Sequence, residues 1–263
     1  MLYYQAAEKK EQFSPVRNTK LSDAYNHWFK VVPADTPELL EQAYRLRYQV
    51  YCCEHDYETP DEQLEQRETD EFDSRSVHNL LIDRASGAVT GTVRLVLPDQ
   101  KTPEKSFPIQ QICSHPLLAD RIITSTAAEI SRFAVSKRIR QMADGFTSPV
   151  IDHHGDCPID RRNLKSYIAL GLMKATMQMS FEHGITDWFA VMEPSLLRLL
   201  SRFSIYFKPI GSLVAYHGMR QPCHANVGAF LKRVRRENFE FWEFITESSC
   251  SLNDGGIAVN LSA

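Results

Sequence analysis

The chain has 263 residues, of which 43% are hydrophobic and 24% are charged, a balance typical of a globular protein with a substantial core. Its formal net charge of -3 gives it no overall positive field, which argues against nucleic acid as a partner. No apolar run approaches the roughly 20 residues that span a bilayer, and the first residues lack the apolar core of a signal peptide, so we expect a cytoplasmic protein without a transmembrane segment.

The two ends of the chain differ in composition from the part between them. Residues 1–27 are polar and aperiodic, and residues 248–263 read SSCSLNDGGIAVNLSA, so we expect a flexible N-terminal segment and a C-terminal tail. A single domain over residues 28–247 is the simplest interpretation of the rest. Six cysteines without a CxxC pair predict reduced, mostly structural thiols and no metal site.

The first predicted elements are a strand at residues 29–32 and a helix that follows it. The helix begins where Thr36, a capping residue, precedes Pro37 in the first turn. Its apolar residues then recur at helical spacing up to Val50.

Three β-rich runs come next in the chain. Residues 77–82 and 89–97 are joined by a short segment that ends in Gly87, which predicts a hairpin. A third strand is expected at residues 128–135, after a long connection.

Helical and strand patterns then alternate. We expect a helix at residues 163–183 that ends at Gly184, a strand at 188–192, a helix at 194–203 and a strand at 213–216. The complete order of elements favours an α/β (α+β) architecture, with one mixed central sheet and helices on its faces.

Charged residues interrupt several segments that otherwise look buried. They are Arg47, near the aromatic residues Tyr51 and Tyr57, then Asp70, Asp73, Arg94, Glu129 and Arg132. Because a buried charge is costly unless it is paired, these residues predict an ionic network or a polar cleft. From the residues alone, a structural salt-bridge cluster is as good an interpretation as a catalytic site. In a strand of period two, Glu129 and Arg132 lie on opposite faces unless a bulge intervenes.

The order of these segments and their amino-acid sequences resemble those of a known family. The run R-x-x-V-Y with a later aromatic residue, D-x-x-D, G-T-V-R-L and E-I-S-R-F-A-V together resemble the acyl-homoserine-lactone (autoinducer) synthases over residues 47–135. The segments LRYQVYCCEHDYE, SVHNLLIDRASGAVTGTVRLVLP and HGMRQPC are more similar to the PEP-CTERM exosortase-associated acyltransferases, relatives that also resemble N-acyl amino acid synthases.

The resemblance implies a GNAT-like acyltransferase fold, in which two central parallel strands splay apart and admit an acyl thioester. It also implies acyl carrier protein as a partner that brings the acyl group as a co-substrate, with no other cofactor. The residues that fall on the charged motif positions of the family are Arg47, Asp70, Asp73, Arg94, Glu129 and Arg132, and Phe133 lies in the last of these motifs. Tyr51 and Tyr57 replace its usual phenylalanine and tryptophan on the acceptor side, which makes an amino acid more plausible than S-adenosylmethionine as the acceptor.

Acyl transfer to an amine needs a neutral amine, a polarised thioester carbonyl and an apolar slot for the acyl chain. Glu129, or Asp70 through a water, is the candidate general base. Backbone N–H groups near the third strand would stabilise the oxyanion. The three motif arginines would hold a carboxylate or order the acidic residues.

The segment after the third strand bears on the acyl donor. CoA-dependent GNAT enzymes usually carry R/Q-x-x-G-x-G/A there, whose backbone N–H groups cradle a pyrophosphate. Residues 138–143 read RIRQMA, without the central glycine, which argues against CoA. The cluster Lys137, Arg138 and Arg140 could meet the acidic surface of a carrier protein, although such a run is more often a solvated face.

We therefore predict an N-acyltransferase that moves a medium or long fatty acyl group from acyl carrier protein to the amine of an amino acid or similar small molecule. The same fold with S-adenosylmethionine as acceptor would make an acyl-homoserine lactone. An alternative of a different class is a non-catalytic acyl-binding or sensor domain on a GNAT scaffold.

Overall fold

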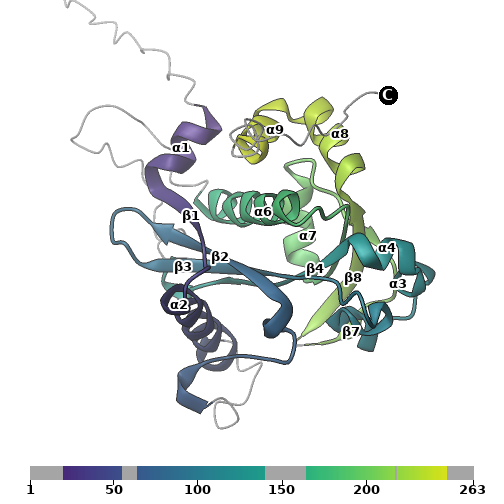
Figure 1. Ribbon diagram of the computed structural model, residues 1–263. Coiled ribbons are helices and arrows are strands. Elements are labelled where there is room, and N and C mark those ends of the chain that lie inside the picture. The colour runs from purple at the N-terminus through teal and green to yellow at the C-terminus, as the bar shows by residue number, and fades with distance from the viewer. Residues whose placement is uncertain (1–19, 55–63, 140–163, 217, 248–263) are drawn as a thin grey trace, which may run out of the picture.

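The computed structural model describes residues 20–54, 64–139, 164–216 and 218–247 (Figure 1). Within these residues an open mixed sheet of eight strands has helices on both faces, which confirms the predicted architecture. The strands are β1 (Phe29–Pro33), β2 (Ser76–Asp83), β3 (Val89–Val96), β4 (Ala127–Val135), β5 (Asp187–Met192), β6 (Lys208–Pro209), β7 (Val214–Ala215) and β8 (Met219–Asn226). The α-helices are α1 (Leu21–Trp28), α2 (Pro37–Tyr48), α3 (Pro116–Ala119), α4 (Arg121–Thr126), α6 (Leu164–Glu182), α7 (Pro194–Ser201), α8 (Val227–Glu237) and α9 (Phe239–Thr246).

The sheet opens between its two parallel strands. Its order is β1-β2-β3-β4-β5-β8-β6, with β7 paired to β8. Strands β4 and β5 form its parallel pair, and their pairing runs only from Ala127 and Asp187 to Ile130 and Ala190. Beyond these residues β4 continues beside β3, and β5 continues beside β8. The expected splay of two central parallel strands is therefore confirmed.

A bulge interrupts β4 just after it leaves β5. Arg94 of β3 lies opposite Ser131, and Thr92 lies opposite Ala134, so β4 holds one residue more than its partner. Arg132 lies in this bulge with a φ of 49°. The sequence alone did not establish whether β4 contains a bulge. The bulge is present, and it turns Arg132 to the face of the strand that carries Ser131.

Helix α2 covers one face of the sheet, and α6 lies on the other (Figure 1). Helix α2 begins as predicted, because the Thr36 side chain accepts a hydrogen bond from the N–H of Leu39 and Pro37 occupies the first turn. Its continuation is a π-helix, Gln49–Glu54. Helix α6 is buried on nearly all sides, because the sheet packs below it and α9 above it. It ends at Glu182, and Gly184 follows with a φ of 63°, which suits glycine.

Helix α1 lies in residues that were expected to be loosely ordered. Tyr25 is 1% exposed in the main core and packs against Phe29 and Phe244. A Cβ atom at Gly171 of α6 would lie only 2.6 Å from the Tyr25 ring, so the glycine permits this close contact. The expectation of a loose segment is therefore wrong for residues 21–27, while the domain boundaries as a whole stay predictions.

The last part of the sheet also differs from the prediction. The strand expected at residues 213–216 is the two-residue β7, and the longer strand is β8, which pairs with β5 from Gln221 to Asn226. Strand β8 was not predicted because it contains Pro222 and several polar residues, which are uncommon within buried strands. Among the helices described, none is both long and apolar enough to span a membrane.

Candidate functional site

A cavity of about 330 Å³ lies where β4 and β5 diverge. Its volume suits a small ligand, since such sites typically measure about 300–1,000 Å³. One part of its wall is apolar and comes from β4, α6 and α7, with Ile130, Phe133, Ile168, Ala169, Leu196 and Leu199. The polar lining residues include Tyr51, Glu129, Ser131, Arg132, Glu193, Tyr216 and Arg220. The arrangement can hold an apolar chain beside ionisable groups.

Glu129 is the buried acid of this cavity. It lies two residues before Ser131 and therefore on the same face of β4. Its side chain is almost fully enclosed, and one oxygen accepts a hydrogen bond of 2.8 Å from the N–H of Ile109. Burial raises the pKa of Glu129 to about 7, although the Ile109 hydrogen bond opposes the rise. Such a group can accept and release a proton near neutral pH.

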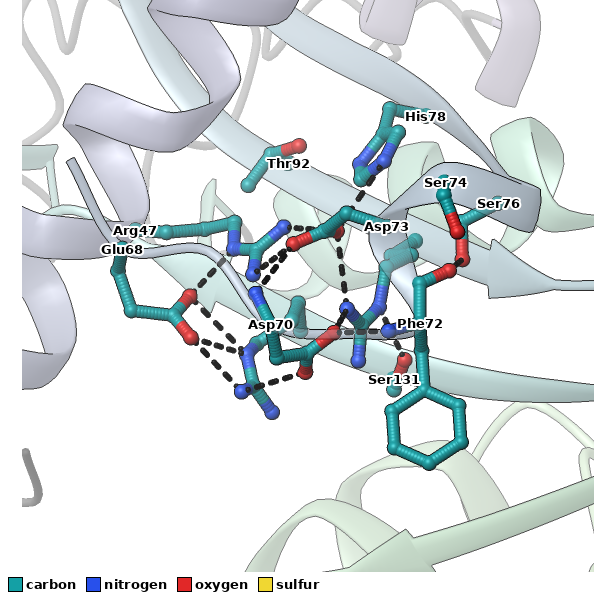
Figure 2. Close-up of polar contacts among 12 residues, drawn as sticks. Arg47, Glu68, Asp70, Phe72, Asp73, Ser74, Ser76, His78, Thr92 and Ser131 are labelled. Carbon is teal, nitrogen blue, oxygen red and sulfur yellow. Dashed lines mark hydrogen bonds and ion pairs between the residues drawn. The ribbon is translucent and has the colours of Figure 1, made fainter. Parts of the chain in front are cut away.

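An ionic network adjoins the cavity, because Arg132 belongs to the network and also lines the cavity. Within this network Arg47 lies between Glu68 and Asp73 (Figure 2). Arg47 is 0% exposed. Its two terminal nitrogens donate to the two oxygens of Asp73 at 2.6 and 3.0 Å, and its Nε donates to Glu68. This bidentate arrangement is among the stronger ionic contacts in proteins.

Two further arginines complete the network. Arg94 Nη1 lies 2.6 Å from Asp70 Oδ1 and 2.9 Å from Asp73 Oδ1, and its Nε donates to Ser131. Arg132 Nη2 lies 2.7 Å from Glu68 Oε1 and 3.1 Å from Asp70 Oδ2. Three arginines thus meet three carboxylates, and the paired charges can remain buried.

The network fixes the protonation of its members. Although burial opposes ionisation, the charges of Arg47 and Arg132 lower the pKa of Glu68 to about 2. Hydrogen bonds and charge from Arg47 likewise hold the pKa of Asp73 far below its usual range, against the effect of burial. Burial and the nearby Arg47 charge lower the pKa of His78 to about 3, so its imidazole is neutral at pH 7.

We expect the protein to lose stability in acid because of these carboxylates. Their folded-state pKa values lie below the unfolded ones, so their contribution is present above the unfolded pKa and is lost as the pH falls from about 5 to 2. Urea unfolding at a series of pH values measures this, and Glu68→Gln should flatten the profile. The exposed Glu104→Gln is the control. A wild-type free energy of unfolding that stays constant over this range would contradict the expectation.

The structure separates the predicted residues into two groups. Tyr51, Glu129, Arg132 and Phe133 line the cavity. The fully buried Arg47 and Arg94, with Asp73, belong to the ionic network and are not among the lining residues. Asp70 is one-quarter exposed and holds two arginines. Of the expected carrier-binding residues, Lys137 and Arg138 are exposed just after β4. Tyr57 and Arg140 lie outside the described residues.

Several residues of the site were not among the predicted ones. Glu68 bridges Arg47 and Arg132, and the acidic stretch around it was the available signal. Glu193, Tyr216 and Arg220 come from the end of β5 and from the segment around β7 and β8. The HGMRQPC segment contains Arg220, but its pattern gave no sign of a strand.

Comparisons with known proteins agree with this geometry. A family model described as acetyltransferase (GNAT) domain matches residues 46–144. The crystal structure of TofI in a ternary complex with an inhibitor and MTA is 21% identical, with a TM-score of 0.54 over 79% of this chain and 96% of that one. FeeM, an N-acyl amino acid synthase from uncultured soil microbes, is 14% identical, with a TM-score of 0.53 over 80% of this chain and 97% of that one. None of the curated proteins compared matches the sequence.

The described residues therefore share the fold of TofI and of FeeM, and residues 46–144 match the model of a GNAT acetyltransferase domain. This confirms the predicted resemblance for the fold. The narrower resemblance to exosortase-associated acyltransferases stays a prediction.

Proposed function

We propose that this protein is an N-acyltransferase that moves a medium or long acyl group from acyl carrier protein to the amine of an amino acid or a similar small molecule. The observation that carries the proposal is the cavity between the diverging strands. Its apolar wall suits an acyl chain, and Glu129 lies among its polar lining with a pKa of about 7.

The chemistry requires two protein contributions. Glu129 takes a proton from the acceptor amine, whose nitrogen then attacks the thioester carbon, and the carbon–sulfur bond breaks to release a thiol. The proton can return to the leaving sulfur. After Ile130, β4 still pairs with β3 but no longer pairs with β5. The backbone groups of β4 that point toward β5 are therefore available to face a ligand. Backbone N–H donors there would stabilise the oxyanion.

Glu129 suits the role of base better than Asp70, the other predicted candidate. Asp70 Oδ1 lies 2.6 Å from Arg94 and accepts the N–H of Phe72, while Oδ2 lies 3.1 Å from Arg132. Both oxygens of Asp70 are thus engaged by guanidinium groups, and Asp70 is not among the residues that line the cavity. Asp70 is therefore better suited to order the arginines.

The acceptor has two candidates. FeeM, which shares the fold, is an N-acyl amino acid synthase, and the aromatic Tyr51 is one of the residues that line the cavity. TofI, which also shares the fold, was crystallised with MTA, so S-adenosylmethionine and an acyl-homoserine lactone product are the alternative. The donor's carrier protein would meet the exposed Lys137 and Arg138.

Mass spectrometry of product mixtures tests the proposal. Purified protein is incubated with acyl carrier proteins or CoA bearing C8 to C16 acyl chains, together with the twenty amino acids and S-adenosylmethionine. We expect an N-acyl amino acid, formed faster from the carrier-protein donors. A homoserine lactone would establish the alternative. Donor binding without any product would indicate a non-catalytic acyl-binding domain.

The cavity wall should set the acyl-chain length. Ala169 of α6 lines the cavity and is 4% exposed, so Ala169→Leu should fill part of the slot. We expect the preferred donor to become shorter by several carbons, which is measured by competition between donors of different length. Ala175→Leu is the matched control, because Ala175 lies on the same helix, is equally enclosed and is not a lining residue. An unchanged length preference in folded Ala169→Leu would place the acyl chain elsewhere.

A further inference from the structure

Two arginines, Arg132 and Arg220, line the cavity, and their guanidinium groups contact different partners. Arg132 is committed to the network, because its Nε and Nη2 contact Glu68 and Nη2 also contacts Asp70. These contacts are partly buried, and giving them up for a substrate would remove one of the two arginines that hold each carboxylate. Arg132 is therefore poorly suited to bind an anionic group of a ligand.

Arg220 is held in the cavity wall by contacts of a different kind. It lies near the start of β8, opposite Val214 of β7. Its Nε donates to the carbonyl oxygen of Tyr216 at 2.9 Å, which fixes the orientation of the guanidinium plane. Its Nη2 is 3.3 Å from Glu193, whose side chain is 45% exposed. A long ion pair with an exposed carboxylate contributes little and is easily exchanged.

The surroundings of Arg220 also favour an anion. Arg220 and Tyr51 both line the cavity, and the positive charge of Arg220 opposes part of the rise that burial causes in the pKa of the Tyr51 phenol. Helix α7 begins at Pro194, directly after Glu193, so the positive end of its dipole lies at the same rim of the cavity. A planar guanidinium at such a place matches the two oxygens of a carboxylate.

We propose that Arg220 binds the carboxylate of the acceptor and thereby selects amines that carry a free carboxylate next to the amino group. The carboxylate takes the place of Glu193 on the guanidinium, and the amine is directed toward Glu129 in the same cavity. Arg220 is thus a specificity-determining residue. This inference rests on the proposed N-acyl transfer.

The test compares acceptors that differ only in the carboxylate. Wild-type protein, Arg220→Met and Arg220→Lys are assayed with one acyl carrier protein donor, the twenty amino acids and the matching carboxamides. We expect the wild type to prefer the free acid over its carboxamide, and Arg220→Met to raise the KM for the acid about 10- to 100-fold, as for the loss of a charged hydrogen bond. The carboxamide should be little affected, and Arg220→Lys should fall between. Arg198→Met, an exposed change on α7, is the matched control.

The outcomes separate the inference from the proposed function. Equal losses for acid and carboxamide in Arg220→Met would overturn the role of Arg220 while acyl transfer stands. If Arg220→Met does not fold, a wild-type protein that acylates acid and carboxamide equally well would overturn it in the same way. A wild-type protein that acylates no amine would overturn the proposed function, and this inference with it.

Discussion

Replacement of Glu129 by glutamine is expected to lower kcat/KM about 10²- to 10⁴-fold, the usual contribution of general base catalysis. Glutamine keeps the size of the side chain and an oxygen that can accept the N–H of Ile109, so the fold should survive. The pH profile carries the sharper expectation. Because the base form of Glu129 appears as the pH rises through about 7, wild-type kcat/KM should rise with an inflection there. The variant should lack this inflection while keeping the one that belongs to the acceptor amine.

Asp70→Asn is the comparison for this experiment. Loss of the Asp70 charge weakens the contacts to Arg94 and Arg132, so activity should fall. The inflection near pH 7 should remain. Rates are measured by product formation over pH 5.5 to 9 with protein shown to be folded. An Asp70→Asn variant that loses the inflection, together with a Glu129→Gln variant that keeps it, would reassign the base to Asp70.

The largest loss of stability is expected from Arg47→Met. This change leaves two buried carboxylates, Glu68 and Asp73, without their shared partner. Removing one partner of a buried ion pair typically costs about 3–5 kcal/mol. We expect a decrease of this size in the free energy of unfolding at pH 7, measured by urea denaturation.

Arg45→Met is the matched control on the same helix. Arg45 is 59% exposed and pairs with Glu41 one turn away, so its loss should cost no more than about 0.5 kcal/mol. A decrease in Arg47→Met as small as in the control would mean that the ionic network is open to water in solution.

Local patterns in the sequence predicted most of the sheet. The strand around Glu129 and the helix that begins after Thr36 both lie as expected, because apolar periodicity and capping are local properties. The buried charges of this part of the chain also pointed to an ionic network or polar cleft. The structure contains both, with Arg132 as the residue that takes part in each.

The rest of the site depends on tertiary contacts that no local pattern reveals. Arg132 joins the network through a bulge in β4, and a bulge has no reliable signal in a single sequence. Glu68 belongs to an acidic stretch whose pattern does not distinguish it from its neighbours, and only the fold brings two arginines against it. Arg220 reaches the cavity because β8 pairs with β5. The polar residues and the proline of β8 do not form a pattern that predicts a strand.

Photo-crosslinking from the acyl chain tests most directly whether the space between β4 and β5 is the site of transfer. A donor whose acyl chain carries a diazirine near its end is bound to the protein, irradiated and located by peptide mass spectrometry. We predict labels within residues 130–135 of β4, 164–182 of α6 and 194–201 of α7, which competing unlabelled donor should abolish. Competable labels confined to other segments, such as α8 and α9, with transfer activity intact, would contradict the account.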